Sequence, residues 1–222
     1  MSIKGIIFDF IGTTVIEKDP AVLNRCFVEA FNDHNVTIAI ELIKENRGKD
    51  KKEMINEILS QQNFPLHLTE QILQSFCVHL QNNLDNFYEN KGAGDIFIYL
   101  KERKILTGLG SGLPRDIFEN IFTHIGWRED YFDYIGIAEE TGRSRPYPDM
   151  ILDMMKKLNL HNDEMLKVGD TLADIQEGKN AKVMTVAILS GTQNEKEIIK
   201  SEPDFTIRSL KELRQILNGR QV

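Results

Sequence analysis

GIIFDFIGTT, residues 5–14, is the stretch that decides the fold. Its apolar first half is typical of a short strand buried on both faces of a sheet. Asp9 closes that strand, and a Gly-Thr turn follows it. An ionised carboxylate at such a place can act as a nucleophile, although aspartate is also a common turn and helix N-cap residue. The stretch therefore predicts a strand over residues 3–9 that carries a candidate catalytic Asp9.

A second stretch, MLKVGDTLAD at residues 165–174, repeats this plan and ends its apolar run in Asp170. If both strands belong to one parallel sheet, Asp9 and Asp170 converge at the edge where ligands bind in such folds. Two carboxylates repel each other unless a divalent cation lies between them, and their hard oxygen atoms suit Mg²⁺. We therefore predict a Mg²⁺ site with Asp9, Asp170 and Asp174 as ligands. The alternative for Asp174 is that it only stabilises a helix N-terminus.

The remainder of the chain alternates strand-like and helix-like segments after residue 92. We expect strands at residues 105–109, 134–138, 165–168, 183–188 and 204–207. Helices are expected at residues 114–125, 148–158, 172–181 and 209–218. This alternation predicts an α/β fold, a doubly wound parallel sheet with a Rossmann-like core.

Residues 20–90 differ, because their apolar residues recur at helical spacing and give no strand signal. Such an insert directly after the first strand predicts an all-helical cap domain. We assign residues 1–14 and 91–222 to the α/β catalytic core and residues 15–90 to the helical cap. Hinges are expected near residues 14–20 and 88–94.

Composition and charge narrow the classes of molecule that this protein is expected to bind. The 222 residues carry a net charge of -7, and 41% of them are hydrophobic. This acidic balance argues against nucleic-acid binding, which relies on clustered Lys and Arg. No apolar run approaches the roughly 20 residues that span a bilayer, and the N-terminus lacks a secretory signal pattern. We expect a cytoplasmic protein with a small-molecule substrate and no membrane partner, either a monomer or a homodimer formed through the cap.

Two further residues suit phosphate binding. Ser111 ends a strand-like run and precedes Gly112, so its hydroxyl and the free backbone N–H groups of this turn can hold phosphate oxygens. Ser111 could equally cap the helix that starts near residue 114. Arg145 lies in a loop after a predicted strand, where its permanent charge would screen repulsion between Asp9 and an approaching phosphate. The alternative is a solvated loop arginine, with Arg143 as a competitor for the role.

Four motifs stand in the order of the haloacid dehalogenase superfamily and span most of the core: FDFIGTT, GLGSGLPRD, SRPYPD and VGDTLADIQEGKNA. The chain resembles that family. The resemblance implies Mg²⁺-dependent hydrolysis through an aspartyl-phosphate on Asp9, with the backbone carbonyl of Ile11 as a further metal ligand. It also implies a cap that closes over the site, excludes water and selects substrate.

Position 11 departs from most phosphatases of the family, which carry there an aspartate that protonates the leaving group. General acid–base assistance is typically worth about 10²–10⁴-fold, so Ile11 predicts weak activity on alkyl phosphate esters. The branch of phosphonoacetaldehyde hydrolase also lacks this aspartate, and FDFIGTTV and SRPYPDM resemble it. Cleavage of a carbon–phosphorus bond needs an electron sink on carbon, which that branch obtains from a cap lysine that forms a Schiff base.

The stretch RGKDKKEMI, residues 47–55, resembles the part of the cap that carries this lysine, and Lys51 aligns best with it. The alternative is that Lys49, Lys51 and Lys52 form a solvated charge run. Met54 and Leu113 replace a histidine and a tyrosine that the branch uses, which favours an altered substrate.

We also expect substrate contacts from three further residues, Thr13, Gly112 and Arg47. Arg47 stands where the branch carries a methionine before the glycine, which again favours an altered substrate.

We therefore expect a Mg²⁺-dependent hydrolase that cleaves the phosphoryl group from a small phosphonate or phosphate compound. Its catalytic residues would be Asp9, Ser111, Arg145 and Lys51. The main alternative is a phosphate-binding or regulatory protein with little turnover, because Ile11 replaces the acid. A phosphoacceptor receiver domain also pairs strand-end carboxylates around Mg²⁺, but the helical insert and the chain length argue against it.

Overall fold

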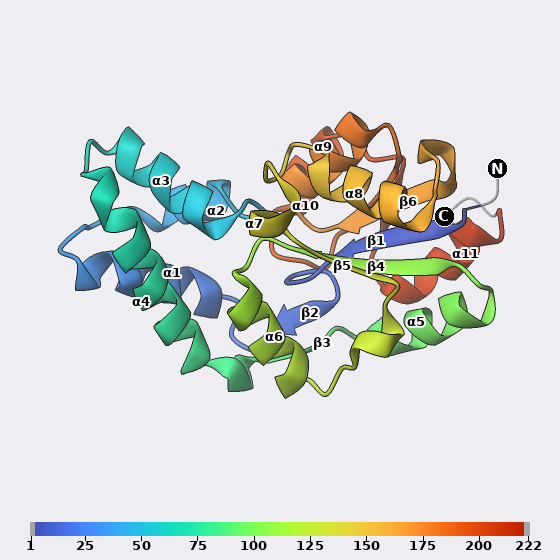
Figure 1. Ribbon diagram of the computed structural model, residues 1–222, viewed down its shortest axis with the longest axis horizontal. Helices are drawn as coiled ribbons and strands as arrows, with labels where there is room; N and C mark the ends of the chain where they lie inside the picture. Colours follow the sequence, from blue (N-terminus) through green and yellow to red (C-terminus); the bar gives the residue numbers. More distant parts are fainter. Residues whose placement is uncertain (1–2, 220–222) are drawn as a thin grey trace.

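The computed structural model describes residues 3–219 and has an α/β core joined to a helical cap (Figure 1). Six parallel strands form the core sheet in the order β5-β4-β1-β6-β7-β8. Their bounds are β1 Gly5–Asp9, β4 Leu106–Ser111, β5 Tyr134–Ile137, β6 Met165–Gly169, β7 Met184–Ile188 and β8 Phe205–Ile207. The doubly wound parallel sheet predicted from the sequence is confirmed.

The central strand β1 is buried on both faces, as its continuous apolar sequence requires. Ile6 and Phe8 face one layer, where Phe8 meets Phe97 edge to face at 5.5 Å. Ile7 faces the other layer and packs in a cluster with Met154. This two-sided burial fixes the strand, and with it the position of Asp9 at its carboxyl end.

Helices cover both faces of the sheet. In Figure 1, α8 and α9 lie above the sheet and α5 and α11 below it. The core helices are α5 Ala93–Glu102, α6 Arg115–His124, α7 Ala138–Thr141, α8 Asp149–Leu158, α9 Leu172–Ala181, α10 Glu195–Lys200 and α11 Leu213–Leu217. Short 3₁₀ turns lie at Leu66–Leu68, Leu84–Asn86, Glu129–Tyr131, Asn162–Glu164 and Leu210–Glu212. No helix within residues 3–219 is long and apolar enough to cross a bilayer.

The cap, at the left of Figure 1, contains α1 Val22–Asp33, α2 Ile40–Glu45, α3 Lys51–Gln61 and α4 Thr69–Gln81. Its centre is the stacked pair Phe27 and Phe76, whose ring centroids lie 3.8 Å apart between α1 and α4. These residues are fully buried, and they belong to one apolar cluster that also contains Phe8 and Phe10 of the core. The helical insert predicted after the first strand is confirmed.

The two ends of the predicted cap segment are not helical. β2 Val15–Glu17 and β3 Phe87–Glu89 pair as an antiparallel ribbon where the chain leaves and re-enters the core. The expectation of a segment without strands up to residue 90 is therefore wrong at β3. Strands of three residues are too short to show a periodic pattern, and their partner lies about 70 residues away. The domain boundaries at residues 15 and 90 stay a prediction.

The sequence also missed three core helices, α5, α7 and α10. The strands and helices that it did predict agree with the structure to within about two residues, the usual uncertainty at element ends, except the last helix, which begins at Leu213 after a 3₁₀ turn instead of at residue 209.

Candidate active site

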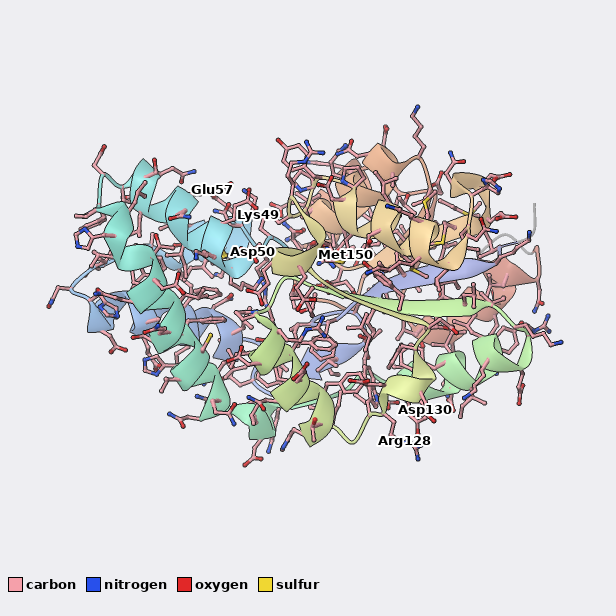
Figure 2. All side chains as sticks on the ribbon, in the orientation of Figure 1. Lys49, Asp50, Glu57, Arg128, Asp130 and Met150 are labelled. Atoms are coloured by element: carbon pink, nitrogen blue, oxygen red, sulfur yellow. The ribbon has the colours of Figure 1, made fainter. Side chains whose placement is uncertain are left out.

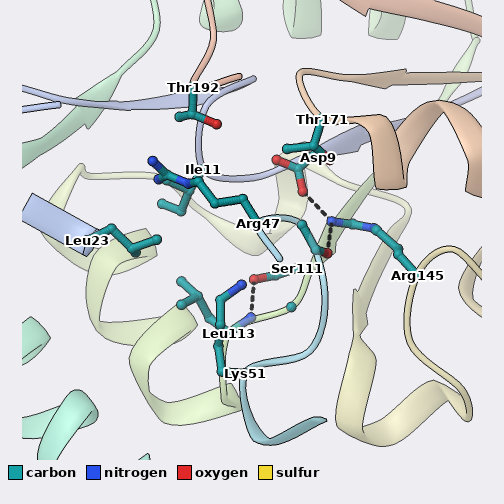
Figure 3. Close-up of a pocket in the computed structure, with 12 residues that line it drawn as sticks. Asp9, Ile11, Leu23, Arg47, Lys51, Ser111, Leu113, Arg145, Thr171 and Thr192 are labelled. Atoms are coloured by element: carbon teal, nitrogen blue, oxygen red, sulfur yellow. Dashed lines mark hydrogen bonds and ion pairs between the residues drawn. The ribbon is translucent and has the colours of Figure 1, made fainter. Parts of the chain in front are cut away.

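The sheet register brings the predicted residues to one edge. Asp9 lies beside Gly110 of β4, so Ser111, the next residue of β4, lies just beyond Asp9 at the same edge. On the other side of β1, Phe8 lies beside Val168 of β6, which places Asp170 just beyond Asp9. The convergence expected from two neighbouring parallel strands is therefore present. Figure 3 shows Asp9 at this edge among the side chains that line the adjoining cavity.

Asp9, Asp170 and Asp174 form one buried acidic cluster. Each offers a carboxylate oxygen, and these oxygens lie within 4.8 Å of one another. Burial, together with the charge of Asp174, raises the pKa of Asp9 to about 7. Burial also raises the pKa of Asp170 above its usual value. Such a cluster is unfavourable in the ionised form unless a cation offsets its charge.

Asp170 is held from two directions. Its Oδ1 accepts a hydrogen bond from the Thr13 hydroxyl at 3.0 Å. Its Oδ2 accepts from the backbone N–H of Thr192 at 2.7 Å and from the Thr192 hydroxyl at 2.5 Å. A Cβ at Gly12, whose φ is +101°, would lie 2.2 Å from this carboxylate, and one at Gly191 would lie 2.1 Å from the Asp170 Cβ. The two glycines therefore leave the space that the carboxylate fills.

The substrate contact predicted for Thr13 stays a prediction, and its side chain contacts Asp170. Its hydroxyl is fully buried and directed at Asp170, so the side chain orients a candidate metal ligand. Thr192 acts on the same carboxylate and was not found by sequence reasoning. It lies outside every motif, and only the loop after β7 brings it to the site.

Asp174 lies in the first turn of α9 with both oxygens paired. Its Oδ2 accepts from the Thr171 hydroxyl at 2.6 Å, and its Oδ1 lies 2.9 Å from the Lys167 ammonium. Burial alone would raise the pKa of Asp174, but Lys167 and Arg145 hold that pKa below its usual value. Asp174 is thus the most firmly ionised member of the cluster, and its role as a direct metal ligand stays a prediction.

Arg145 lies against the candidate nucleophile rather than in solvent. Its side chain is 3% exposed, and one terminal nitrogen lies 2.5 Å from Asp9 Oδ1. Its Nε donates to Glu177 at 3.0 Å, on α9. A guanidinium placed this way can screen the Asp9 charge from an incoming phosphoryl group, and this role of Arg145 stays a prediction. The competitor Arg143 pairs with Asp149 at the surface.

The cap rests directly on this site. The backbone N–H of Lys51 donates to the carbonyl of Gly112 at 3.2 Å, and Arg145 donates to the carbonyl of Gly48 at 3.3 Å. A Cβ on Gly112 would lie 2.4 Å from the Lys49 carbonyl oxygen, so only glycine allows this approach. The cavity between the cap and the core measures about 30 Å³, which leaves room for water.

The lysines of the predicted charge run have different surroundings. Lys49 pairs on the cap with Glu57 at 2.5 Å (Figure 2). Lys52 pairs there with Glu70 at 2.7 Å. Lys51 instead lines the cavity, is 6% exposed, and donates to the Lys49 carbonyl at 2.8 Å. Burial lowers the pKa of Lys51 to about 8. The reading of the whole run as a solvated face therefore does not hold for Lys51.

Three further residues that the sequence singled out also line the cavity. Arg47 reaches in from the cap and pairs with Glu17 of β2 at 2.8 Å. Ser111 is 2% exposed, and its hydroxyl accepts from the Leu113 N–H at 3.1 Å instead of capping α6. Ile11 also lines the cavity, so the position of the missing acid faces the reaction space (Figure 3).

The donor atoms at this sheet edge test whether a metal fits. Asp9, Asp170 and Asp174 each offer a buried carboxylate oxygen, and these oxygens lie within 4.8 Å of one another. Burial raises the pKa of Asp9 and of Asp170, so a divalent cation beside them would stabilise their ionised forms, and hard oxygen donors suit Mg²⁺. The residues therefore fit the ion that the sequence predicts.

Known proteins share both the sequence pattern and the architecture. Residues 6–188 match the family model described as haloacid dehalogenase-like hydrolase. Phosphonoacetaldehyde hydrolase from Bacillus cytotoxicus is 25% identical, over 98% of this chain and 96% of the relative. The enzyme of that name from Parabacteroides distasonis is 29% identical, over 95% and 84%.

A crystal structure gives the same result for the fold. The phosphonoacetaldehyde hydrolase-like protein from Oleispira antarctica superposes with a TM-score of 0.84 at 18% identity, covering 99% of this chain and 92% of that one. Because the family model spans most of the core and the whole cap, the chain belongs to the haloacid dehalogenase-like hydrolase family.

Proposed function

We propose that this hydrolase is Mg²⁺-dependent and removes the phosphoryl group from a small phosphonate or phosphate compound through an aspartyl-phosphate on Asp9. The observation that carries the proposal is the buried contact of 2.5 Å between Asp9 and Arg145, beside Asp170. It gives a nucleophile, a cation for the incoming phosphoryl group and a metal ligand at one sheet edge.

In this proposal Asp9 Oδ attacks phosphorus, and the bond from phosphorus to the leaving group breaks. Arg145 and the Ser111 turn, with the backbone N–H groups around Gly112, hold the phosphoryl oxygens. A bound Mg²⁺, held by Asp9, the Ile11 carbonyl and Asp170, would supply neutralisation of the charge that develops on those oxygens. Water then hydrolyses the aspartyl-phosphate, which releases phosphate and restores Asp9.

A phosphonatase-like reaction explains the apolar residue at position 11. The neutral amine of Lys51 would condense with a substrate aldehyde and release water, giving an imine. When Asp9 attacks phosphorus, the electron pair of the carbon–phosphorus bond moves toward the imine and forms an enamine, so no proton is needed on a leaving oxygen. Proton uptake and hydrolysis then return the amine. Arg47 and Leu113 on the cavity wall favour a substrate other than phosphonoacetaldehyde itself.

One observation favours a second candidate, a phosphate-binding or regulatory protein with little turnover. Among the described residues that line the cavity, Asp9 is the only acid, so no other carboxyl group there takes over the role lost at Ile11. Mg²⁺ and phosphate binding without product release would support this candidate.

A substrate panel separates the two. Phosphate release should be measured from phosphonoacetaldehyde, acetyl phosphate, p-nitrophenyl phosphate and glucose 6-phosphate, with Mg²⁺ and after its removal by a chelator. We expect turnover of at least one compound with a leaving group that needs no proton, weak turnover of the sugar ester, and loss of about 10²-fold or more without Mg²⁺. Equal rates with and without chelator would contradict the metal-dependent mechanism.

Lys51 gives a separate prediction on the imine. Borohydride should trap an adduct between the protein and phosphonoacetaldehyde, and the trapped amount should rise about tenfold per pH unit up to pH 8. The trapped amount rises with pH because only the neutral amine reacts and the pKa of Lys51 is about 8. Lys51→Arg should abolish the adduct, whereas Lys52→Arg, on the cap surface, should not. Equal trapping in Lys51→Arg would show that Lys51 is not the imine lysine.

A further inference from the structure

Beneath the candidate site lies a buried ion pair that the mechanism above does not use. Lys167 stands in the middle of β6 and Glu177 on α9, and their side chains are 0% and 1% exposed. The Lys167 ammonium lies 2.9 Å from Glu177 Oε2 and 2.9 Å from Asp174 Oδ1. A charged pair removed from water is costly and persists only where the surrounding groups require it.

The same Glu177 oxygen also holds Arg145. Oε2 accepts from the Arg145 Nε at 3.0 Å, while the far end of the guanidinium contacts Asp9 at 2.5 Å and Asp174 at 3.4 Å. Because the guanidinium is planar, fixing its Nε and one terminal nitrogen fixes its orientation. Glu177 therefore determines which face of Arg145 meets the nucleophile.

Lys167 leaves Arg145 free to contact Asp9, because Lys167 neutralises part of the charge of Asp174 and Glu177. Without the Lys167 charge, Asp174 and Glu177 would be two carboxylates that share Arg145 as their nearest cation. Arg145 would then be drawn toward α9 and away from Asp9. Glycine at position 178 lets α9 pack closely against β6. A Cβ on Gly178 would lie 3.2 Å from the Lys167 Cβ and 2.5 Å from a Thr185 methyl group.

We propose that Lys167 and Glu177 are positioning residues, which hold Arg145 against Asp9 and set the net charge that the metal site presents to Mg²⁺. The inference rests on the proposed Mg²⁺-dependent function of the same site. It makes a prediction that a purely structural ion pair does not. Removing the cation and removing the anion should change Mg²⁺ affinity in opposite directions.

The test is calorimetric titration of the full-length protein with Mg²⁺, without substrate, for Lys167→Met, Glu177→Gln and the double variant. We expect Glu177→Gln to weaken Mg²⁺ binding and Lys167→Met to strengthen it, each by about tenfold, and the double variant to return to within about threefold of wild type. The matched control is the Lys/Glu pair of Lys4 and Glu164 at the surface, where Lys4→Met should leave the affinity unchanged.

Turnover supplies the second readout, on whichever panel compound is hydrolysed. Both single variants should lower kcat by about 10–100-fold with little change in KM, because the orientation of Arg145 is lost. If Lys167→Met does not fold, Glu177→Gln and the double variant carry the test, since neither leaves Glu177 unpaired and charged. Mg²⁺ affinities that fall in both single variants, or that stay at the wild-type value in both, would overturn the inference. Failure of the wild-type protein to bind Mg²⁺ would instead overturn the proposed function as well.

Discussion

Asp9→Asn is expected to abolish turnover, with a loss of at least about 10⁴-fold in kcat, while the metal-free protein becomes more stable. The loss follows because an amide cannot form the aspartyl-phosphate. The gain in stability follows from burial, which raises the pKa of Asp9 to about 7. Phosphate release and thermal unfolding, each measured on the same preparation, check the two parts.

The size of the stability change depends on pH. The folded pKa of Asp9, about 7, lies above its unfolded value of 3.8, so the stability of the metal-free fold falls as pH rises from about 4 to about 7 and stays at the lower level above that. At pH 8 we expect Asp9→Asn to raise Tm by at least about 2–4 °C, the equivalent of about 1 kcal/mol for a chain of this size. At pH 4 the advantage should largely disappear. A lower Tm for the variant at pH 8 would contradict this account of the site.

Asp170→Asn is the matched control for the role of Asp9. It removes a proposed metal ligand but leaves the nucleophile, so excess Mg²⁺ should restore part of its activity. No Mg²⁺ concentration should restore Asp9→Asn. Equal rescue of the two variants would mean that Asp9 acts only as a ligand and that the attack on phosphorus comes from another group.

Ile11→Asp is expected to raise kcat/KM for glucose 6-phosphate and other alkyl phosphates by about 10²-fold, within the usual range of general acid–base catalysis. Ile11 lines the cavity beside Asp9, so a carboxyl group there can reach a leaving oxygen and later a water molecule. Acyl and aryl phosphates, whose leaving groups need no proton, should gain much less. Steady-state kinetics on the same panel measures both effects.

The control for this gain is Ile11→Asn, which has nearly the same size as aspartate but no proton to donate. It should leave alkyl phosphates as poor substrates. If asparagine gives the same increase as aspartate, the gain comes from polarity or space, and the apolar residue does not explain the weak ester activity that we expect.

The sequence by itself determined the strand that ends in Asp9, the second acidic turn at Asp170 and the helical insert between them. Each of these is a local pattern, an apolar run of fixed period followed by a turn, and local patterns can be read without knowing what packs against them. The parallel alternation after residue 92 then required the two strand ends to meet at one edge. The resemblance to the family follows from the same stretches.

The buried ion pair of Lys167 and Glu177 is only weakly indicated by the sequence. Lys167 interrupts an otherwise apolar strand, and Glu177 lies three residues after Asp174, on the same side of a helix. A lysine inside a fully buried strand requires an anion nearby, but the sequence does not say which one. The structure selects Glu177 and Asp174 because α9 packs over β6.

Tertiary structure alone decided the rest. Thr192 reaches Asp170 because the loop after β7 folds back over the sheet edge, and no local pattern records that approach. Lys51 is buried while Lys49 and Lys52 are not, because the cap backbone rests on Gly112 and turns only Lys51 into the cavity. Contacts between segments far apart in the chain depend on how whole elements pack, and that packing sets the burial and the charge on which the chemistry depends.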